Sequence, residues 1–371
     1  MSKDKIDYLM IILIVLLLGI GLSMLFSASY YHSEKIGKGP LHIFNKQLLF
    51  VALGAVAMIF AARVPLAAIR KTIPLIVLGT MVFSLLPFAP GIGKEINGAR
   101  RWVVILDYTF QPSELIKLAV VLYVASILEK KADRIDDPLN ALLPPFIIVF
   151  IFSVIIFFQN DLSTSFFILF IALAIFYIAQ IRLVYFAYLG SLIIPLGLGL
   201  LLTGDYWRNK LMTFLDPTRD PFGMGFQVRH AKIALEQGGF FGKGVGMSTQ
   251  KLGFLPEPDS DFIFAITGEE IGFIGIFFII VLFALFTFRG YVLSWKSKDK
   301  FKYYLGFGIT TTIIVQAVMN MAVTIGLMPT TGMPLPFFSL GGSAMLVTLF
   351  MCGLLINISR SRETQGGVFN G

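Results

Sequence analysis

Three carboxylates lie within five residues of one another in the stretch 255–264. They are Glu257, Asp259 and Asp261, and prolines stand on both sides of Glu257. Proline fixes φ and disfavours a helical conformation for the residue before it, so this stretch should be extended. Two interpretations follow. Asp261 caps the helix that begins next, or it is a general base whose acidic neighbours orient it or bind a cation.

Further ionisable residues lie inside or at the edge of strongly apolar runs. Glu114 and Lys117 are three residues apart, so they share one helix face. They form either a buried ion pair that fixes helix packing or a polar wall of an internal cavity. Glu269 and Glu270 are adjacent, and at least one of them should face the protein interior, a partner or water. Asp161 is expected to cap the helix that follows it.

Several common motifs are absent. Lys243 follows a glycine, but the next residue is Gly244, where a phosphate-binding P-loop needs Ser or Thr. The three histidines, at 32, 42 and 230, lack the spacing of a zinc site. No serine nucleophile elbow is present. The sequence therefore predicts no organic cofactor, and a divalent cation such as Mg²⁺ or Mn²⁺ remains possible, with Asp259 as a ligand.

The composition predicts an all-α integral membrane protein, because 56% of the residues are hydrophobic and only 14% are charged. About 20 apolar residues cross a bilayer as a helix. The basic residues are scattered between apolar runs, which fits membrane orientation better than nucleic-acid binding. We expect one domain over 1–371 with about ten transmembrane helices, at 8–29, 47–62, 72–88, 112–128, 142–158, 162–179, 183–203, 262–288, 303–326 and 341–358.

The positive-inside rule places both termini in the cytoplasm. Two outer segments then stand apart, 89–111 and the long loop 204–261 between the seventh and eighth spans. A loop of nearly sixty residues is usually functional, and its aromatic residues argue against disorder. Within it, 227–235 reads as an amphipathic helix suited to the membrane surface. The Gly- and Pro-rich stretch 326–343 should help to wall an outward-facing pocket around Asp261.

In these residues the chain resembles the shape, elongation, division and sporulation (SEDS) family, the FtsW/RodA type of peptidoglycan polymerase. The resemblance covers nearly the whole chain. It is carried by residues 97–102, 110–119, 214–217, 238–244, 255–270 and 326–343. The stretches 99–102, 225–227, 248–252 and 268–270 are similar to the division type, FtsW, whereas 333–336 is shared with the elongation type, RodA.

The chain also departs from the family pattern. Asp259-Ser260-Asp261 stands where the family usually has His-Thr-Asp, Leu340 replaces a Tyr, and Ala344 replaces a Ser. Asn160 and Ser163 replace the Pro and Gly of a Gln-Pro-Asp-Leu-Gly-Thr motif. Position 259 thus has a carboxylate where the family has an imidazole.

The resemblance implies glycosyl transfer on lipid II, an undecaprenyl-diphosphate-linked disaccharide-pentapeptide, at the outer face of the bacterial cytoplasmic membrane. A diphosphate leaves readily, so one base is enough, and Asp261 is the expected base, assisted by Glu257. The partners implied are a class B penicillin-binding protein, which is a transpeptidase, and other divisome membrane proteins at the septum. Residues expected to contact substrate are Arg101, Trp102, Glu114, Lys117, Arg208, Lys210, Arg229, Lys243 and Ser339.

Two alternatives remain beside a division polymerase. One is an elongation-type polymerase that sets cell shape. The other is a transporter or flippase of a lipid-linked precursor, because about ten spans with buried charges also suit a translocation path. No inverted repeat is visible, and the ionisable residues gather at the outer side, which favours the polymerase.

Overall fold

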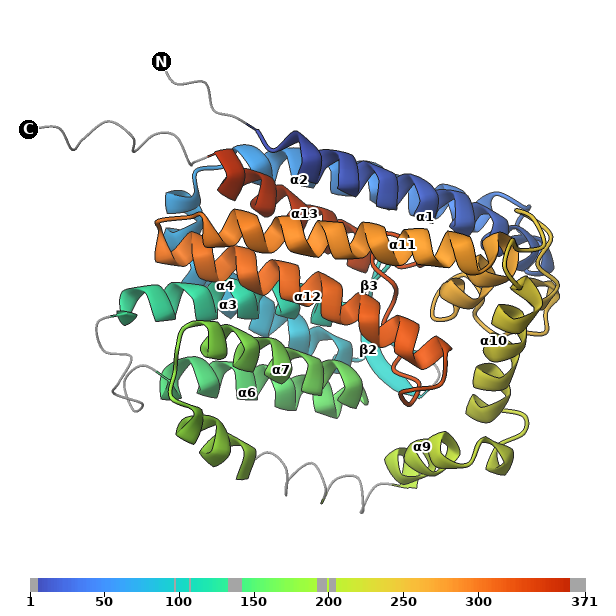
Figure 1. Ribbon diagram of the computed structural model, residues 1–371. Helices are drawn as coiled ribbons and strands as arrows, with labels where there is room; N and C mark the ends of the chain where they lie inside the picture. Colours follow the sequence, from blue (N-terminus) through green and yellow to red (C-terminus); the bar gives the residue numbers. More distant parts are fainter. Residues whose placement is uncertain are drawn as a thin grey trace, which may run out of the picture.

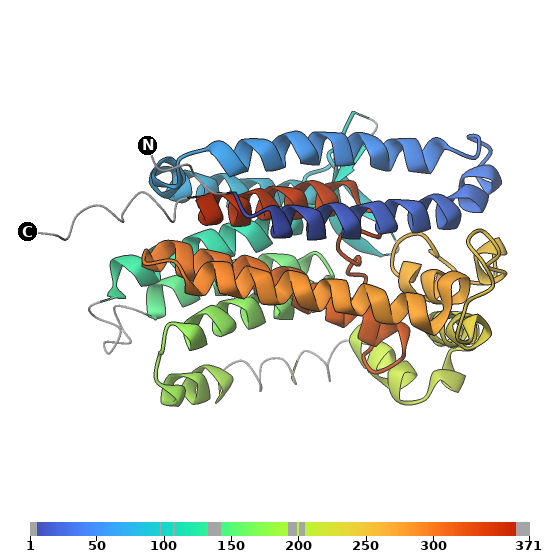
Figure 2. The same cartoon turned by 45° about the horizontal axis from the view of Figure 1, so that its top comes forward.

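The computed structural model describes residues 6–96, 98–106, 108–132, 142–191, 199 and 205–360. Its long helices lie side by side as a bundle (Figure 1). The start of α1 and the end of α13 lie at one end of the bundle, and α10 lies at the opposite end (Figures 1 and 2). The helices are α1 (Tyr8–Lys35), α2 (His42–Arg63), α3 (Leu66–Leu85), α4 (Pro112–Lys130), α6 (Leu143–Phe158), α7 (Leu162–Ile178), α9 (Asp205–Leu215), α10 (Met224–Gly238), α11 (Ile263–Trp295), α12 (Lys300–Thr324) and α13 (Gly342–Arg360).

Six helices are long and apolar enough to cross a membrane, namely α1, α2, α3 with its short extension to Phe88, α11, α12 and α13. The helices α6 and α7 are shorter but strongly apolar. Nine of the ten expected runs coincide with a described helix to within a few residues at most ends. The tenth, 183–203, falls partly outside the described residues, and 183–191 is helical.

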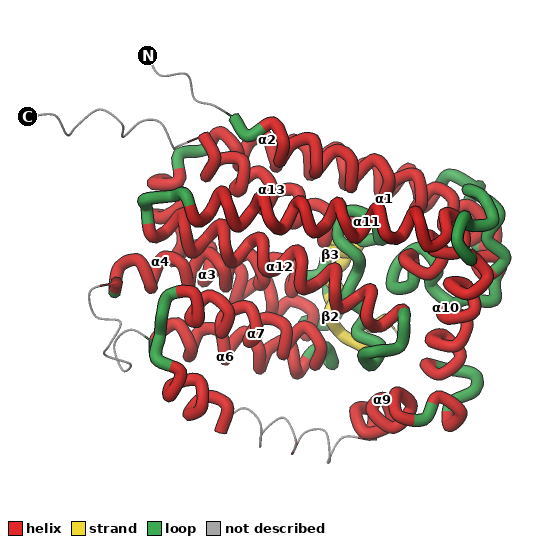
Figure 3. The backbone as a smooth tube through the Cα atoms, viewed as in Figure 1, coloured by secondary structure: helices red, strands yellow, loops and turns green. Residues whose placement is uncertain are grey.

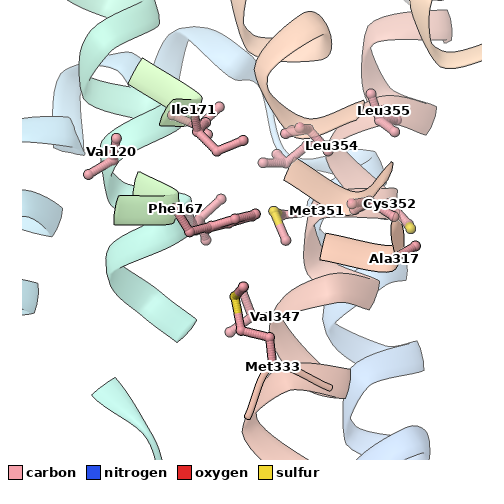
Figure 4. Packing of buried hydrophobic residues seen from close by; sticks show 14 of the residues in the cluster. Val120, Phe167, Ile171, Ala317, Met333, Val347, Met351, Cys352, Leu354 and Leu355 are labelled. Atoms are coloured by element: carbon pink, nitrogen blue, oxygen red, sulfur yellow. The ribbon is translucent and has the colours of Figure 1, made fainter. Parts of the chain in front are cut away.

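The core of the bundle lies around α13, whose apolar residues are almost all buried. Figure 4 shows Phe167 of α7 pointing toward Met351 of α13. The seam between α13 and α2 is made by glycines. A Cβ at Gly353 would lie 2.3 Å from the carbonyl oxygen of Met58, and one at Gly54 would lie 2.6 Å from Leu349. Small residues allow such close helix approach in membranes, where helix packing depends on contact rather than on the hydrophobic effect.

A small antiparallel sheet departs from the expected all-α fold. It has the order β1 (Gly93–Ile96), β2 (Ala99–Ile105) and β3 (Tyr108–Phe110), and Val103 is paired with both Gly93 and Phe110. Figure 3 shows the strands in yellow among the red helices. Charged residues interrupt the alternation of apolar and polar positions here, so the residue pattern does not indicate strands. The sheet leads directly into α4 and presents Arg101 and Trp102.

The helix α11 is broken at Gly272, whose φ of 68° and ψ of −171° are not helical. A Cβ at Gly268 would lie 3.6 Å from Ile276, yet residues eight apart in a straight helix are separated by about 12 Å. The segment 263–271 therefore folds back against the segment 273–295. This fold-back places residue 261 beside α12, where Asn320 donates a hydrogen bond of 2.9 Å to the carbonyl oxygen of Asp261.

The loop 239–244 supplies the hydrogen bonds that the break removes. The backbone N–H groups of Phe273 and Ile274 donate to the carbonyls of Gly239 and Phe240, at 2.9 and 3.2 Å. In return, Lys243 N and Gly244 N donate to the carbonyls of residues 269 and 270, at 2.9 and 3.0 Å. A backbone polar group inside the hydrocarbon region needs such a partner within the protein, because no water is available there. The glycine motif at 238–244 thus provides hydrogen-bond partners for the backbone on both sides of the helix break.

The long loop is largely helical. Besides α9 and α10 it contains the short helices η3 (Pro217–Arg219) and η4 (Gln250–Leu252). The expected helix at 227–235 is present within α10. Ala231, Ala234 and Gly238 form its buried face, which packs against the first part of α11.

Candidate active site

A cavity of about 430 Å³ lies where the start of α2, the sheet, the loop before α11 and the start of α13 meet. Asp261, Glu257, Arg101 and Trp102 all line it. The structure therefore brings together four of the residues that the sequence singled out. Polar and apolar side chains share the wall, as expected of a site that takes an amphipathic ligand.

Asp261 faces this cavity and does not cap a helix. The N-cap position of α11 is Phe262, which makes no side-chain cap hydrogen bond. The interpretation of Asp261 as a helix cap is therefore wrong. One carboxylate oxygen of Asp261 and the guanidinium of Arg101 both lie within 4 Å of the point that a Cβ on Gly332 would occupy. Gly332 has a φ of +69°, so its backbone and its missing side chain both favour glycine here.

The environment of Asp261 favours its protonated form relative to a carboxyl group in water. Burial raises the pKa of Asp261 to about 6, and the negative charge of Glu257 adds to this effect. Arg101 and Lys210 act in the opposite direction by stabilising the carboxylate. A carboxylate whose pKa lies near neutrality is well suited to accept a proton during a reaction.

Arg101 is held in place by Asp161. Its Nη1 lies 3.0 Å from the Asp161 Oδ2, and Asp161 is almost fully buried. The other carboxylate oxygen of Asp161 accepts a hydrogen bond of 3.1 Å from the Thr164 N–H, so Asp161 is also the expected N-cap of α7. The guanidinium lies 5.9 Å from the ring of Trp102. Asp161 therefore links the start of α7 to the cation beside Asp261.

Lys210 of α9 belongs to the same group of charges. Burial lowers the pKa of Lys210, while the negative charges of Asp161 and Asp261 raise it. Lys210 lines a neighbouring apolar groove of about 250 Å³ between α7, α9 and residues 328–331. Its positive charge acts on Asp261 from the long loop's first helix.

Asp259, the expected metal ligand, turns away from the cavity. Its carboxylate lies 2.9 Å from Nδ1 of His32 on α1 and is nearly buried. Across the described ranges, no three His, Cys, Asp or Glu side chains come together as a metal site would require. The donor set present does not fit a metal held by the protein alone. Asp259 instead fixes the loop between Glu257 and Asp261 to α1.

Ser339 has a structural position beneath the site. Its hydroxyl donates to the carbonyl oxygen of Ser260 at 2.6 Å and accepts from the Leu335 N–H at 2.8 Å. Ser339 does not line the cavity. It instead holds the backbone beside Asp261 against the loop 335–339.

Glu114 and Lys117 form a buried ion pair of 2.7 Å, outside the cavity lining. Lys117 also donates to Gln316 of α12 at 2.7 Å, and Gln316 donates to the carbonyl oxygen of Pro334 at 2.8 Å. The pair thus joins α4 to α12 and supports the loop at the cavity floor. Its geometry corresponds to the first of the two interpretations, a pair that fixes packing.

The remaining expected contact residues lie elsewhere. Lys243 is paired with Glu269 at 2.6 Å, and Glu270 is paired with Lys251 at 2.7 Å, so both acids of α11 face the protein interior. Arg229 is exposed on α10. Arg208 lines a separate cavity of about 560 Å³ beside Arg219 and Asp220. The cavity of Asp261 is not lined by Lys243, Arg229 or Arg208.

The sequence analysis missed the contribution of α2. Lys38, His42 and Lys46 line the cavity from the loop before α2 and from its first turns. The spacing of four residues, which places side chains on one helix face, was the available signal. The expected start of the span at residue 47 left these residues outside the helix and so concealed their common face.

The chain matches the model of a family described as FtsW/RodA/SpoVE cell cycle protein over residues 7–364. The chain belongs to this family. The resemblance seen in the sequence is thereby confirmed for nearly the whole chain.

Curated FtsW/RodA/SpoVE relatives match over almost their entire length. The chain is 35% identical to a probable peptidoglycan glycosyltransferase FtsW of Geobacter sulfurreducens over 356 residues, which are 96% of this chain and 95% of the relative. It is 36% identical to stage V sporulation protein E of Bacillus subtilis over 359 residues, covering 97% and 98%.

Solved structures share the fold of this FtsW/RodA/SpoVE chain. One belongs to a peptidoglycan synthase complex that coordinates polymerization and crosslinking, with a TM-score of 0.80, 23% identity and coverage of 97% and 99%. Another is the rod shape determining protein RodA of Thermus thermophilus, with a TM-score of 0.68, 22% identity and coverage of 97% and 98%. These likenesses establish a membrane-protein fold of the RodA kind.

Proposed function

We propose that this chain is a peptidoglycan glycosyltransferase that polymerises lipid II into glycan strands during septal cell-wall synthesis. The observation that carries the proposal is that Asp261 and Arg101 line one cavity, at the end of the bundle that holds the long loop. The names of the curated relatives, which include both FtsW and a sporulation protein, support a role in septum formation over elongation.

Asp261 acts as the general base. Its carboxylate takes the proton from the acceptor sugar hydroxyl as that oxygen forms a bond to the anomeric carbon of the donor. The bond from this carbon to the diphosphate oxygen breaks at the same time, and the lipid diphosphate leaves with the electron pair. General-base assistance contributes about 10²- to 10⁴-fold in rate. Arg101 keeps Asp261 in the charged form that accepts the proton.

The neighbouring residues have supporting roles in this proposal. Glu257 faces the cavity beside Asp261 and is the second catalytic carboxylate. The ring of Trp102 also lines the cavity and stacks against the sugar. Lys210 of α9 adds positive charge that acts on Asp261. No step passes through a metal ion.

The proposed arrangement in the membrane has ten crossings with both termini in the cytoplasm and the loop 204–261 outside. The apolar helices and the two shorter helices α6 and α7 supply most of these crossings. The cavity then opens toward the outer face of the bacterial cytoplasmic membrane. A class B penicillin-binding protein and other divisome proteins would receive the strands there, as in the synthase complex that shares the fold.

A polymerisation assay tests the function. The purified chain is incubated with lipid II and the transpeptidase, and glycan strands are resolved on a gel. The Asp261→Asn and Asp261→Ala variants should insert and fold but lose at least about 10²-fold in polymer formation. Normal product from Asp261→Ala would refute the general base. Movement of lipid across sealed vesicles without glycan product would instead identify a flippase.

A further inference from the structure

We propose that Lys46, with His42 one helical turn before it, binds the diphosphate of the lipid-linked substrate inside the cavity of Asp261. The inference rests on the proposed function and identifies the cations that hold the leaving group. Both side chains line the cavity from α2, while Asp261 and Glu257 line it from the loop just before α11. Cations and carboxylates therefore face one space from different elements.

The rotation of α2 is fixed by a buried neighbour of Lys46. Gln47 is 1% exposed. It donates to the carbonyl oxygen of Ser339 at 3.4 Å and accepts from the Gly341 N–H at 3.2 Å. These two bonds tie α2 to the loop that also supports Asp261. The face carrying His42, Lys46 and Phe50 is consequently turned into the cavity.

The ammonium of Lys46 is positioned by aromatic rings. It lies 5.2 Å from the centre of the Tyr108 ring, within the range of a cation–π interaction. That ring in turn packs edge-on against Phe50 at 5.6 Å. The Phe50 ring fits because residue 342 is a glycine, where a Cβ would come within 2.4 Å of it. Helix α2, the sheet and α13 thus act together to place one cation.

The charges of the site point to an anion at this position. A diphosphate leaving group needs positive charge close to the oxygens on which negative charge develops. Lysine is well suited to bind phosphate as a point charge. Among the described residues lining the cavity, α2 and the loop before it supply every basic side chain except Arg101.

The cavity lining contains the kinds of group that a lipid-linked sugar needs, namely acids, cations and apolar side chains. The diphosphate lies between the sugar and the polyprenyl chain, so its cations should stand between the base and apolar surface. Ile43 and Phe50 line the same cavity beside Lys46. Beyond them α2 exposes apolar side chains such as Leu53 and Val56, along which a polyprenyl chain can run.

Binding without turnover tests the inference. In an Asp261→Asn background, the protein is placed in phosphatidylcholine nanodiscs and titrated with a fluorescent polyprenyl diphosphate. Lys46→Gln should weaken binding about tenfold, the usual effect of losing one charge-assisted hydrogen bond. Lys46→Arg should recover most of the affinity. Lys94→Gln, which removes an exposed lysine of β1 outside the cavity, should leave it unchanged.

Three results would overturn the inference. The first is an affinity of Lys46→Gln within about twofold of the parent, less than the effect of one such bond. The second is an equal loss for the polyprenyl alcohol, which lacks phosphate, since this would indicate a collapsed cavity. The third is complete displacement of the probe by phosphatidylglycerol, since this would indicate a general anionic-lipid site. A parent protein that forms no glycan polymer from lipid II would refute the proposed function separately, because binding is read without catalysis.

Discussion

The carboxylate of Asp261 sits among three charges that pull its pKa in opposite directions. Burial and Glu257 raise that pKa to about 6, whereas Arg101 and Lys210 oppose the rise. A general base works only when it is deprotonated, so polymerisation should fall as pH drops below about 6. The acidic limb of the pH profile therefore reports directly on this residue.

Substitutions of the two neighbours should move that limb in opposite directions. Arg101→Gln removes a positive charge, raises the pKa of Asp261 and should shift the limb of kcat/KM to higher pH. Glu257→Gln removes a negative charge, lowers the pKa and should shift the limb to lower pH. Both are read from initial rates of lipid II polymerisation between pH 5 and 8, a range of about three units around the limb. A limb that stays in place in both variants would assign it to another group.

The buried pair of Glu114 and Lys117 makes a prediction about stability. Lys117→Met leaves the Glu114 carboxylate buried without its cation, so the protein should lose about 3–5 kcal/mol of stability. The double variant Glu114→Gln, Lys117→Met removes both charges and should recover much of this loss. Thermal unfolding in detergent measures all three proteins. A double variant as unstable as Lys117→Met would argue against a mainly structural pair.

The sequence was informative about which residues carry chemistry but not about which of them meet. The carboxylate cluster, Arg101 and Trp102 could be found because their types are unusual at the edge of apolar runs. Lys243 and Lys46 look alike in the sequence. Only tertiary packing decides that one pairs with Glu269 while the other lines the cavity.

At the scale of elements, hydrophobic runs predicted the helices well, because a crossing helix needs a long apolar stretch. They could not predict the reversal at Gly272, since 263–295 is apolar almost throughout. The sheet was missed for a related reason: its strands are short, and Lys94, Arg100 and Arg101 obscure their alternation. The sheet carries Arg101 and Trp102, and the reversal positions the loop that carries Asp261.

The reversal leads to a prediction about Gly272. A Cβ at this position would lie 2.2 Å from the backbone nitrogen of Gly242, and its φ of +68° is unfavourable for alanine. Gly272→Ala should therefore separate the loop 239–244 from α11, lower the unfolding midpoint and displace Asp261. Polymerisation should be largely lost. The control Gly19→Ala lies in α1 with no atom within 4 Å of its new Cβ, so it should behave as the parent does.

At the scale of the whole molecule, the seam between α2 and α13 joins the membrane bundle to the active site. Its glycines keep the two helices close, and Gln47 and Phe50 of α2 then reach the start of α13. Disturbing the seam should thus affect a cavity that lies several turns away. This expectation distinguishes a site built by the bundle from one built by the outer loop alone.

Gly353→Ala tests the seam. Its Cβ would meet the Met58 carbonyl oxygen at 2.3 Å, so the helices must separate at a cost of about 1–3 kcal/mol. The fully buried Cys352, the one cysteine of the chain, should then react faster with a maleimide, and polymerisation should decline. Gly79→Ala in α3 has no atom within 4 Å of its Cβ and serves as the control. Unchanged labelling in Gly353→Ala would show that the seam tolerates the methyl group.

The fold-back of α11 also resolves a mismatch of length. Its 33 residues as one straight rod would measure about 50 Å, well beyond the roughly 30 Å of hydrocarbon in a bilayer. The break leaves a rod of about 35 Å to cross the bilayer, a good match to that thickness with slight tilt. The remaining turns form the fold-back, which places residue 261 beside Asn320 of α12. One long apolar segment thus supplies both a rod of bilayer length and the support for the loop that carries the acid.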